Sequence, residues 1–127
     1  MSTYKKIGTK LLLRDVYGRP GKPLPTIAHW CEGCQSLHDF PCDVPFPNGH
    51  RWTWNNVVAA PTFVPSMNLS WGHQADPKCT APGGRCHYNI TKGEVQFHND
   101  CTHALKGQKR PLLDVPDSAL AWMIESL

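Results

Sequence analysis

The chain has 127 residues, 40% of them hydrophobic, and a formal net charge of +3; this is the size of one domain, with a globular rather than a disordered composition. The basic residues are dispersed, so a dedicated nucleic-acid binder is not expected. No apolar run approaches the roughly 20 residues that span a membrane, and the N-terminus lacks a signal-peptide core. We therefore expect a single cytosolic domain over residues 1–127, in which six cysteines favour metal binding or free thiols over disulfides.

The first half of the chain predicts short strands separated by turns. A strand over residues 10–16 precedes a turn over residues 17–23, where glycine and proline gather. A second strand over 26–30 leads into a Cys-x-x-Cys turn, and a third over 36–40 leaves it. Residues 51–54 predict a short aromatic strand, whose tryptophans suit a core better than a stacking surface for nucleic acid.

The second half contains the clearest hairpin. Residues 57–70 hold two prolines, so they are expected to be extended but to form neither a central strand nor a helix. A polar loop follows over 72–84. Residues 86–91 and 94–98 flank a two-residue Lys-Gly turn and predict a β-hairpin. A proline followed by a polar start and an apolar stripe predicts a short helix over 117–126.

The turn Cys31-Glu32-Gly33-Cys34 has the spacing of a zinc knuckle. Two thiolates three positions apart reach one ion if the chain turns sharply, and glycine permits such a turn. A redox Cys-x-x-Cys would open a helix, whereas strand residues follow here. We therefore predict a structural zinc ion on Cys31 and Cys34. Cys42 and Cys79 lie outside any motif and are expected to be free thiols.

The hairpin offers the other two ligands. Because side chains alternate along a strand, Cys86 and Cys101 share the apolar face as diagonal neighbours. His103 points the same way if the strand continues that far. We prefer four cysteine ligands and keep His103 as the alternative ligand or as a hydrogen-bonding neighbour of the site. His87 and His98 fall on the opposite, polar face.

The seven histidines raise a second interpretation. His38, His87, His98 and Asp100 carry side chains that could build an open metal site for hydrolysis. The chain has neither a His-Glu-x-x-His helix nor the signature of a zinc deaminase. We therefore assign no catalytic residue from the sequence, and scattered surface histidines are the simpler explanation.

Five short motifs together resemble an uncharacterised family encoded by tailed phages and prophages. Its members are often labelled "ammonia monooxygenase", a label that no residue here supports. Glu32 departs from the pattern, because proline is usual there, and the helix after Pro116 looks like an extension. The matching motifs span about residues 30–108, within a motif core of about residues 26–108. They read Trp30-Cys31-Glu32-Gly33-Cys34 with His38, Trp52-Thr53-Trp54-Asn55, Pro61-Thr62-Phe63-Val64-Pro65-Ser66, Gly84-Arg85-Cys86-His87, and Asp100-Cys101-Thr102-His103-Ala104-Leu105-Lys106-Gly107-Gln108.

The resemblance implies a small zinc-binding phage protein and favours the four cysteine ligands. It also marks a functional surface made by His38, His87, His103 and Asp100. We therefore predict a mainly β, zinc-ribbon-like domain with hairpins and a short C-terminal helix, holding one structural zinc.

The function expected from these features is that of a non-enzymatic phage accessory module. It would bind a host or phage protein in the host cytoplasm, with neither nucleic acid nor membrane as partner. Two alternatives stay open: a small metal-dependent hydrolase using His38, His87 and His103, and a minor component of the virion. The partner's identity and the oligomeric state do not follow from the sequence.

Overall fold

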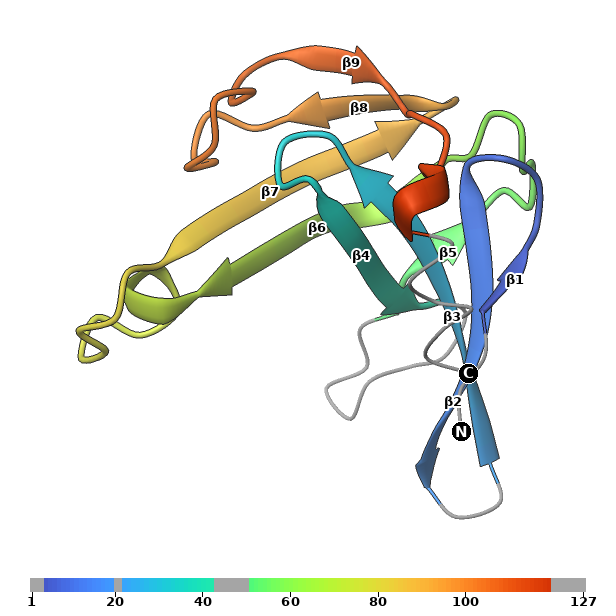
Figure 1. The fold of residues 1–127 in the computed structure, drawn as a ribbon, viewed down its shortest axis with the longest axis horizontal. Helices are drawn as coiled ribbons and strands as arrows, with labels where there is room; N and C mark the ends of the chain where they lie inside the picture. Colours follow the sequence, from blue (N-terminus) through green and yellow to red (C-terminus); the bar gives the residue numbers. More distant parts are fainter. Residues whose placement is uncertain (1–3, 20–21, 43–50, 120–127) are drawn as a thin grey trace.

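Two antiparallel sheets make up the fold in the computed structural model, which describes residues 4–19, 22–42 and 51–119 (Figure 1). The first sheet has the order β1-β2-β3-β4 and the second has the order β5-β6-β7-β8-β9. A short 3-10 helix, η1, spans Gly72–Gln74. The strands are β1 (Tyr4–Lys6), β2 (Leu11–Arg19), β3 (Lys22–Cys31), β4 (Ser36–Pro41), β5 (Thr53–Trp54), β6 (Phe63–Trp71), β7 (Gly84–Thr91), β8 (Glu94–Phe97) and β9 (Lys109–Pro111).

The mainly β class and the predicted hairpin are both confirmed. Strands β7 and β8 pair with Thr91 opposite Glu94, as the sequence predicts. The two turn residues, Lys92 and Gly93, have φ angles of 50° and 78°. Two consecutive positive φ values match the twist of the flanking strands, which is why short hairpin loops favour them.

The chain reverses within residues 17–23 as expected, but the turn is shorter than predicted, because most of that segment belongs to strands. β2 continues to Arg19, and β3 begins at Lys22. Tyr17 is paired with Pro23. Pro23 and Pro25 are two positions apart, so their missing N–H groups lie along one edge of β3. The pairing of β2 with β3 therefore persists through a proline-containing segment.

Strand β6 corrects a second expectation, since it lies inside the second sheet, between β5 and β7. Its pairing with β7 is interrupted: Phe63 lies opposite Ile90, and the next pair joins Met67 to Tyr88. Three residues on β6 therefore stand against one on β7, which is a bulge. Pro65 lies in this bulge, where it breaks no regular ladder hydrogen bond.

The chain leaves the strand after Phe97 rather than continuing to His103. Residues 98–108 form a loop, and the chain returns as β9, which pairs with β8. The predicted C-terminal helix begins as a helical turn over residues 117–119, and the rest of its predicted span lies outside the described residues. In the described part of the chain, no helix has the length and apolarity needed to cross a membrane.

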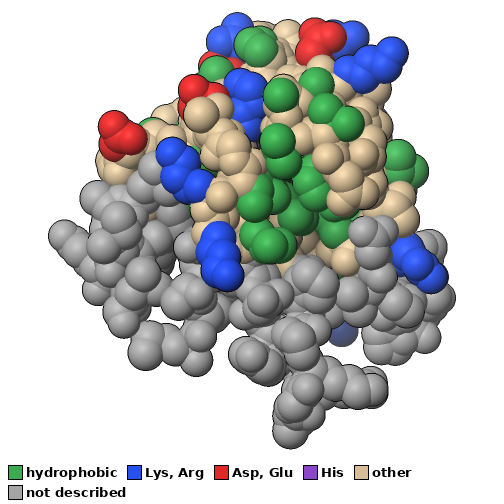
Figure 2. All heavy atoms as spheres, turned by 90° about the vertical axis from the view of Figure 1, so that its right-hand side faces the viewer, with side chains coloured by type: hydrophobic (Ala, Val, Ile, Leu, Met, Phe, Trp, Pro, Cys, Tyr) green, Lys and Arg blue, Asp and Glu red, His purple; other side chains and the backbone are tan. Residues whose placement is uncertain are grey.

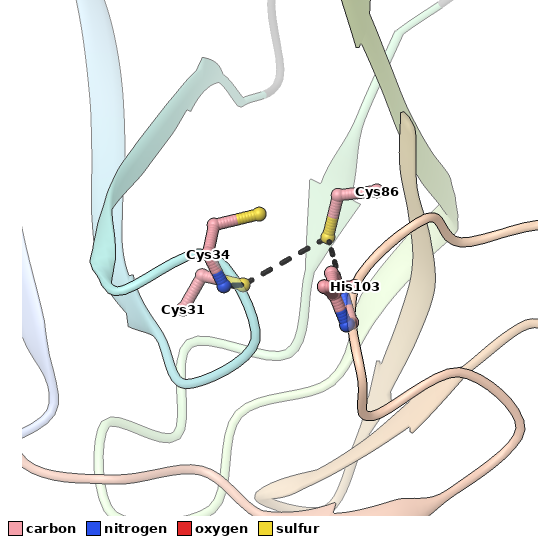
Figure 3. A group of neighbouring side chains, drawn as sticks. All are labelled: Cys31, Cys34, Cys86 and His103. Carbon is pink, nitrogen blue, oxygen red and sulfur yellow. Dashed lines mark hydrogen bonds between the residues drawn. The ribbon is translucent and has the colours of Figure 1, made fainter. Parts of the chain in front are cut away.

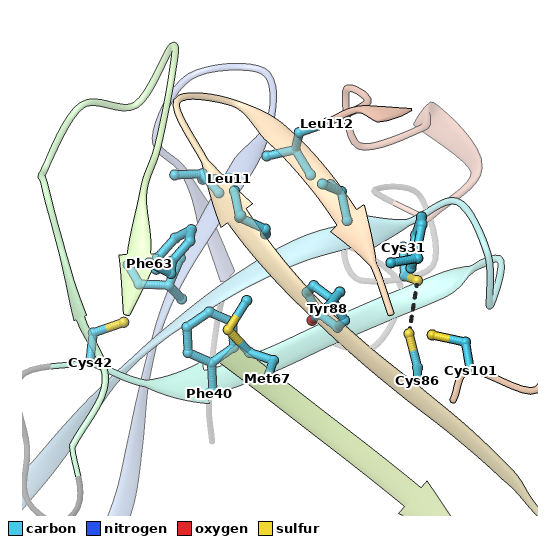
Figure 4. Packing of buried hydrophobic residues seen from close by; sticks show 14 residues of the cluster. Leu11, Cys31, Phe40, Cys42, Phe63, Met67, Cys86, Tyr88, Cys101 and Leu112 are labelled. Carbon is cyan, nitrogen blue, oxygen red and sulfur yellow. Dashed lines mark hydrogen bonds between the residues drawn. The ribbon is translucent and has the colours of Figure 1, made fainter. Parts of the chain in front are cut away.

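The two sheets share one hydrophobic core (Figure 4). Leu11 and Phe40 from the first sheet pack with Phe63 and Met67 from the second. Tyr88 lies at the centre with no exposed surface. Trp52 and Trp54 pack against this cluster, as aromatic side chains of a small β domain are expected to do.

One face of the molecule gathers hydrophobic side chains, with lysine and arginine around them (Figure 2). Val57 and Val58, in the loop between β5 and β6, are 47% and 38% exposed. A Cβ added at Gly8 would lie 3.5 Å from Cβ of Val58, so this loop packs beside the turn between β1 and β2. Some exposed apolar side chains of this kind are usual on the surface of a folded domain.

Candidate functional site

Strand β7 presents chemically active side chains on both of its faces. Cys86 is fully buried and points toward the first sheet, whereas His87 is partly exposed on the opposite face. This follows from the period of two along a strand, which sends consecutive side chains to opposite faces. Two clusters result, one of them inside the molecule and one at its surface.

The inner cluster joins Cys31, Cys34, Cys86 and His103 (Figure 3). One ligand atom from each residue lies within 4.8 Å of those of the others, so the group could hold a metal ion. Sγ of Cys86 is 3.8 Å from Sγ of Cys31 and 3.4 Å from Nε2 of His103. The two ligand pairs come from segments far apart in sequence, the β3–β4 turn and the region around β7 and the following loop.

The turn between β3 and β4 aims its two thiols at this point. The Gln35 N–H donates to the carbonyl of Cys31 over 2.8 Å, and the Cys34 N–H donates to Sγ of Cys31 over 3.4 Å. The positive φ of this turn is at Gln35, with a value of 53°. Gly33 serves a different purpose: a Cβ at this position would overlap the imidazole ring of His103. Glycine therefore lets the histidine approach the knuckle.

The three thiols compete for protons. Hydrogen bonds from Cys34 and Cys86 lower the pKa of Cys31. The matching hydrogen bonds to Cys31 raise the pKa of Cys34 and of Cys86, and burial adds to both shifts. One thiolate is therefore favoured at the expense of its neighbours. A cation at the centre of the group would stabilise all three as thiolates, since metal binding displaces thiol protons.

Cys101 lies outside this group, although the sequence prefers it as the fourth ligand. Its buried Sγ accepts a hydrogen bond from the backbone N–H of His87, and its S–H donates to the carbonyl of His87, both over 3.2 Å. The alternative ligand, His103, joins the three cysteines instead. The reason is that the chain turns away after β8, so the strand alternation that would align Cys101 with Cys86 does not continue.

The outer cluster joins Ser66, His87 and Asp100. Oγ of Ser66 lies 3.1 Å from Nε2 of His87, and Nδ1 of His87 lies 3.2 Å from both carboxylate oxygens of Asp100. A hydroxyl, an imidazole and a carboxylate thus form one hydrogen-bonded chain. This is the arrangement by which a histidine takes the proton of a serine nucleophile while an acid orients the ring.

Neighbouring side chains contact the carboxylate and the imidazole of the outer cluster. Desolvation raises the pKa of Asp100, but the hydrogen bond and charge of His87, with Arg85 3.9 Å away, outweigh it and keep the pKa of this carboxyl below its usual value. The ring of His98 stacks on that of His87, with centroids 4.0 Å apart and planes 10° apart. Nε2 of His98 in turn lies 2.6 Å from Oδ1 of Asn89.

Sequence reasoning missed Ser66. It occurs at the end of the motif Pro61-Thr62-Phe63-Val64-Pro65-Ser66, which carries no known nucleophile signature. The β6–β7 register places Asn68 opposite His87, and Ser66, two positions earlier on β6, shares that face, so its hydroxyl lies diagonally beside His87. The available signal was a serine directly after a proline inside an extended segment, and that signal is weak.

The other predicted functional residues separate. His38 is buried, and its Nδ1 lies 3.2 Å from the Tyr88 hydroxyl, which is also 2.5 Å from Nε2 of His29. His103 lies at the metal group, and His87 points the other way. The sequence predicts one functional surface made by His38, His87, His103 and Asp100. Of these four residues, the structure brings together only His87 and Asp100.

A family model described as "Bacterial ubiquitination-like system serine protease (BubE)" matches residues 6–98. The match covers well over half of the chain, so the protein belongs to the BubE family. Comparison with curated proteins and with solved structures gave no match.

This family corrects the function expected from the sequence. The expectation of a non-enzymatic phage accessory module is wrong, because the matching family is one of serine proteases from a bacterial system. The phage family that the motifs resemble has no support in this comparison. The alternatives of a virion component and of a hydrolase using His38, His87 and His103 have none either, and the three histidines lie in separate environments.

Proposed function

We propose that this member of the BubE family is a serine protease with Ser66 as nucleophile, His87 as general base and Asp100 as the orienting acid. The observation that carries the proposal is the continuous chain of contacts from Oγ of Ser66 through both nitrogens of His87 to the Asp100 carboxylate. All three side chains are at least partly exposed, so a substrate can reach them.

The chemistry follows from the position of each proton. As Oγ of Ser66 attacks a peptide carbonyl carbon, Nε2 of His87 accepts the hydroxyl proton. His87 then gives this proton to the leaving amine, and the peptide bond breaks. The acyl group remains on Ser66 until a water molecule, deprotonated by His87 in the same way, releases it as a carboxylate.

Asp100 fixes which nitrogen of His87 can act. Its ionised oxygens accept the Nδ1–H, which leaves the lone pair of Nε2 facing Ser66. The carboxylate also stabilises the imidazolium that forms when His87 takes up the proton of Ser66. The lowered pKa of Asp100 suits this role, because the carboxyl must be charged at neutral pH.

The substrate class is proposed from the family description. A protease of a bacterial ubiquitination-like system would act on the proteins of that system, by processing a precursor or by removing an attached modifier. The partner of this chain is then a protein substrate held at β6 and β7, within reach of Ser66 and His87.

A fluorophosphonate probe tests the nucleophile directly, since its phosphorus bonds to an activated serine oxygen as fluoride leaves. We expect stoichiometric labelling at Ser66, located by mass spectrometry. Ser66→Ala should abolish the labelling, and Ser70→Ala, on the same strand, should retain it. A folded protein that reacts with no probe at Ser66, or that is labelled equally well after Ser66→Ala, would refute the proposal.

For the inner cluster we propose one structural zinc ion bound by Cys31, Cys34, Cys86 and His103. Three thiolates and one imidazole form a ligand set typical of closed tetrahedral zinc sites. Nδ1 of His103 accepts the Leu105 N–H over 3.2 Å. Binding a metal through Nε2 would place the ring proton on Nδ1. A protonated Nδ1 cannot accept a hydrogen bond, so the hydrogen bond from the Leu105 N–H would be lost. Elemental analysis should find about one zinc per chain, and its absence from protein purified without chelators would contradict the assignment.

A further inference from the structure

A cavity of about 220 Å³ opens between the two sheets where β4 faces β6. Its walls are mainly apolar and aromatic, from Phe40, Trp52, Met67 and Leu69. Asp39 and Asn68 add polar groups, and both are exposed. An enclosure with apolar walls and a few polar groups is the usual composition of a ligand site. Its volume is suited to a single side chain.

The cavity lies beside the part of β6 that follows the proposed nucleophile, on the inner face of this strand, whereas the Ser66 hydroxyl lies on the outer face with His87. Three consecutive lining residues, Met67 to Leu69, follow Ser66 in sequence. The indole N–H of Trp52 donates to the carbonyl of Ser66 over 3.4 Å, so one wall contacts the backbone of the nucleophile. Asn68 lies opposite His87 in the β6–β7 register, which places a lining residue next to the general base.

Strand β6 also offers an edge along which a peptide could lie. β5 pairs with β6 at Val64 and Phe63. From Met67 to Trp71, β6 pairs with β7 on one side, and no other described strand pairs with it on the second side. An extended peptide can add to such an edge through its backbone, while alternate side chains enter pockets beside the strand.

We propose that this cavity is the specificity pocket for the residue that supplies the scissile carbonyl, and that it selects an apolar side chain of the size of leucine, methionine or phenylalanine. The inference rests on the proposed protease function and names the substrate class of that site. Asp39 at the cavity disfavours an acidic side chain there by like-charge repulsion. Loss of apolar contact typically changes kcat/KM by roughly 10–200-fold per small group, so a strong preference for leucine over alanine is expected.

Peptidyl diphenyl phosphonates test the pocket, because their side chain occupies this position while Oγ of Ser66 bonds to phosphorus and phenoxide leaves. Four such probes carrying alanine, leucine, phenylalanine or aspartate are compared by their rate of inactivation. We expect leucine and phenylalanine to react at least about tenfold faster than alanine, and aspartate to be slowest. Equal rates for all four probes would overturn the pocket assignment.

Leu69→Trp narrows the cavity and should reverse the order, so that alanine reacts faster than phenylalanine. Ser70→Trp adds the same bulk at the next, exposed position, which does not line the cavity, and should leave the order unchanged. The small fluorophosphonate, which carries no side chain, should label Ser66 at a similar rate in all three proteins. If the order stays the same in Leu69→Trp while this labelling persists, the cavity does not select the side chain.

A binding measurement separates failure of the pocket from failure of the protease assignment. In the Ser66→Ala variant, acetyl-phenylalanine amide should shift the NMR signals of the Trp52 indole N–H and the Leu69 methyls, and acetyl-aspartate amide should not. If the fluorophosphonate fails to label Ser66 but these shifts occur, the protease function is wrong and the apolar site stands. If the fluorophosphonate labels Ser66 but the amides cause no NMR shift, the protease function stands and the apolar binding site is refuted.

Discussion

Cys86 and His87 are consecutive residues of β7 that serve two different clusters. Sγ of Cys86 lies 3.4 Å from Nε2 of His103, and Nε2 of His87 lies 3.1 Å from Oγ of Ser66. The loop after β8 also serves both clusters, since it supplies Asp100 to the outer cluster and His103 to the inner cluster. A change of backbone position at the inner cluster should therefore reach the outer cluster within one residue.

Removal of the metal should cost fold and activity together. The ion would connect the β3–β4 turn to β7 and to the loop after β8, and an ion that binds the native arrangement alone offsets the entropy of closing so long a chain segment. We expect a strong chelator to lower the melting temperature by about 10 °C or more, since each kcal/mol is worth about 4 °C in a domain of this size. Circular dichroism and fluorophosphonate labelling, followed in parallel, measure the effect.

Added zinc should restore both signals, and Cys86→Ser should reproduce the effect of the chelator. Cys79→Ser is the matched control, because this thiol lies in the loop after η1, away from the metal group. Metal-free protein, verified by elemental analysis, that keeps its melting temperature and its labelling rate would show that the two clusters are independent.

Gly33→Ala should weaken metal binding without removing a ligand. A Cβ at this position overlaps the His103 ring, so the imidazole must move away from the three thiols. We expect the metal affinity to fall by about 10–100-fold, the range seen when the support of a ligand is lost. Competition with a chromophoric chelator gives the affinity. Ser36→Ala, an exposed change close to the same turn, should have the wild-type affinity.

Cys101→Ala separates a metal ligand from a positioning residue. The thiol of Cys101 contacts both the N–H and the carbonyl of His87, and its loss leaves the N–H without this partner, while the carbonyl keeps the His98 N–H as a donor. The free energy of unfolding should fall by about 1–3 kcal/mol, and kcat should fall more than KM rises. Cys101→Ser should recover most of the activity, because a hydroxyl also donates and accepts. In both variants the zinc content should stay at one per chain; its loss would make Cys101 a ligand after all.

Asp100→Asn should disable His87 while leaving fold and metal unchanged. An amide can present its N–H to Nδ1 and so favour the wrong tautomer, for which loss of kcat on the order of 10³–10⁴ is known in serine proteases. Peptide hydrolysis or probe labelling measures it. Asp117→Asn, an exposed change near the C-terminal turn, should match the wild type.

The pH dependence of the Asp100–His87 pair has a defined sign. Because the folded-state pKa of Asp100 is depressed, the contribution of the pair is present above the ordinary carboxyl pKa and is lost as pH falls through the lower folded value. If activity already falls while the pH is being lowered from neutral to about 5, protonation of Asp100 is therefore not the cause. An NMR titration of the Asp100 carboxyl in the folded protein checks this: a midpoint at or above the ordinary carboxyl pKa would contradict the expectation.

The sequence by itself determined the local features. The alternation of apolar residues and the Lys92-Gly93 turn predicted the β7–β8 hairpin with its register, and with it the placement of Cys86 and His87 on opposite faces. The Cys-x-x-Cys spacing likewise predicted a pair of thiols at the end of one strand. These features depend on neighbours within a few residues, where backbone geometry alone decides which side chains share a face.

Tertiary structure alone decided which distant groups meet. Ser66 reaches His87 because β6 pairs with β7 in a register that puts Asn68 opposite His87, and no local pattern in either segment encodes that register. His103 enters the metal group in place of Cys101 because the chain turns after Phe97 and because Gly33 leaves room for the ring. Each pairing joins segments more than twenty residues apart or crosses an irregular loop, where strand periodicity no longer fixes direction and packing of the two sheets does.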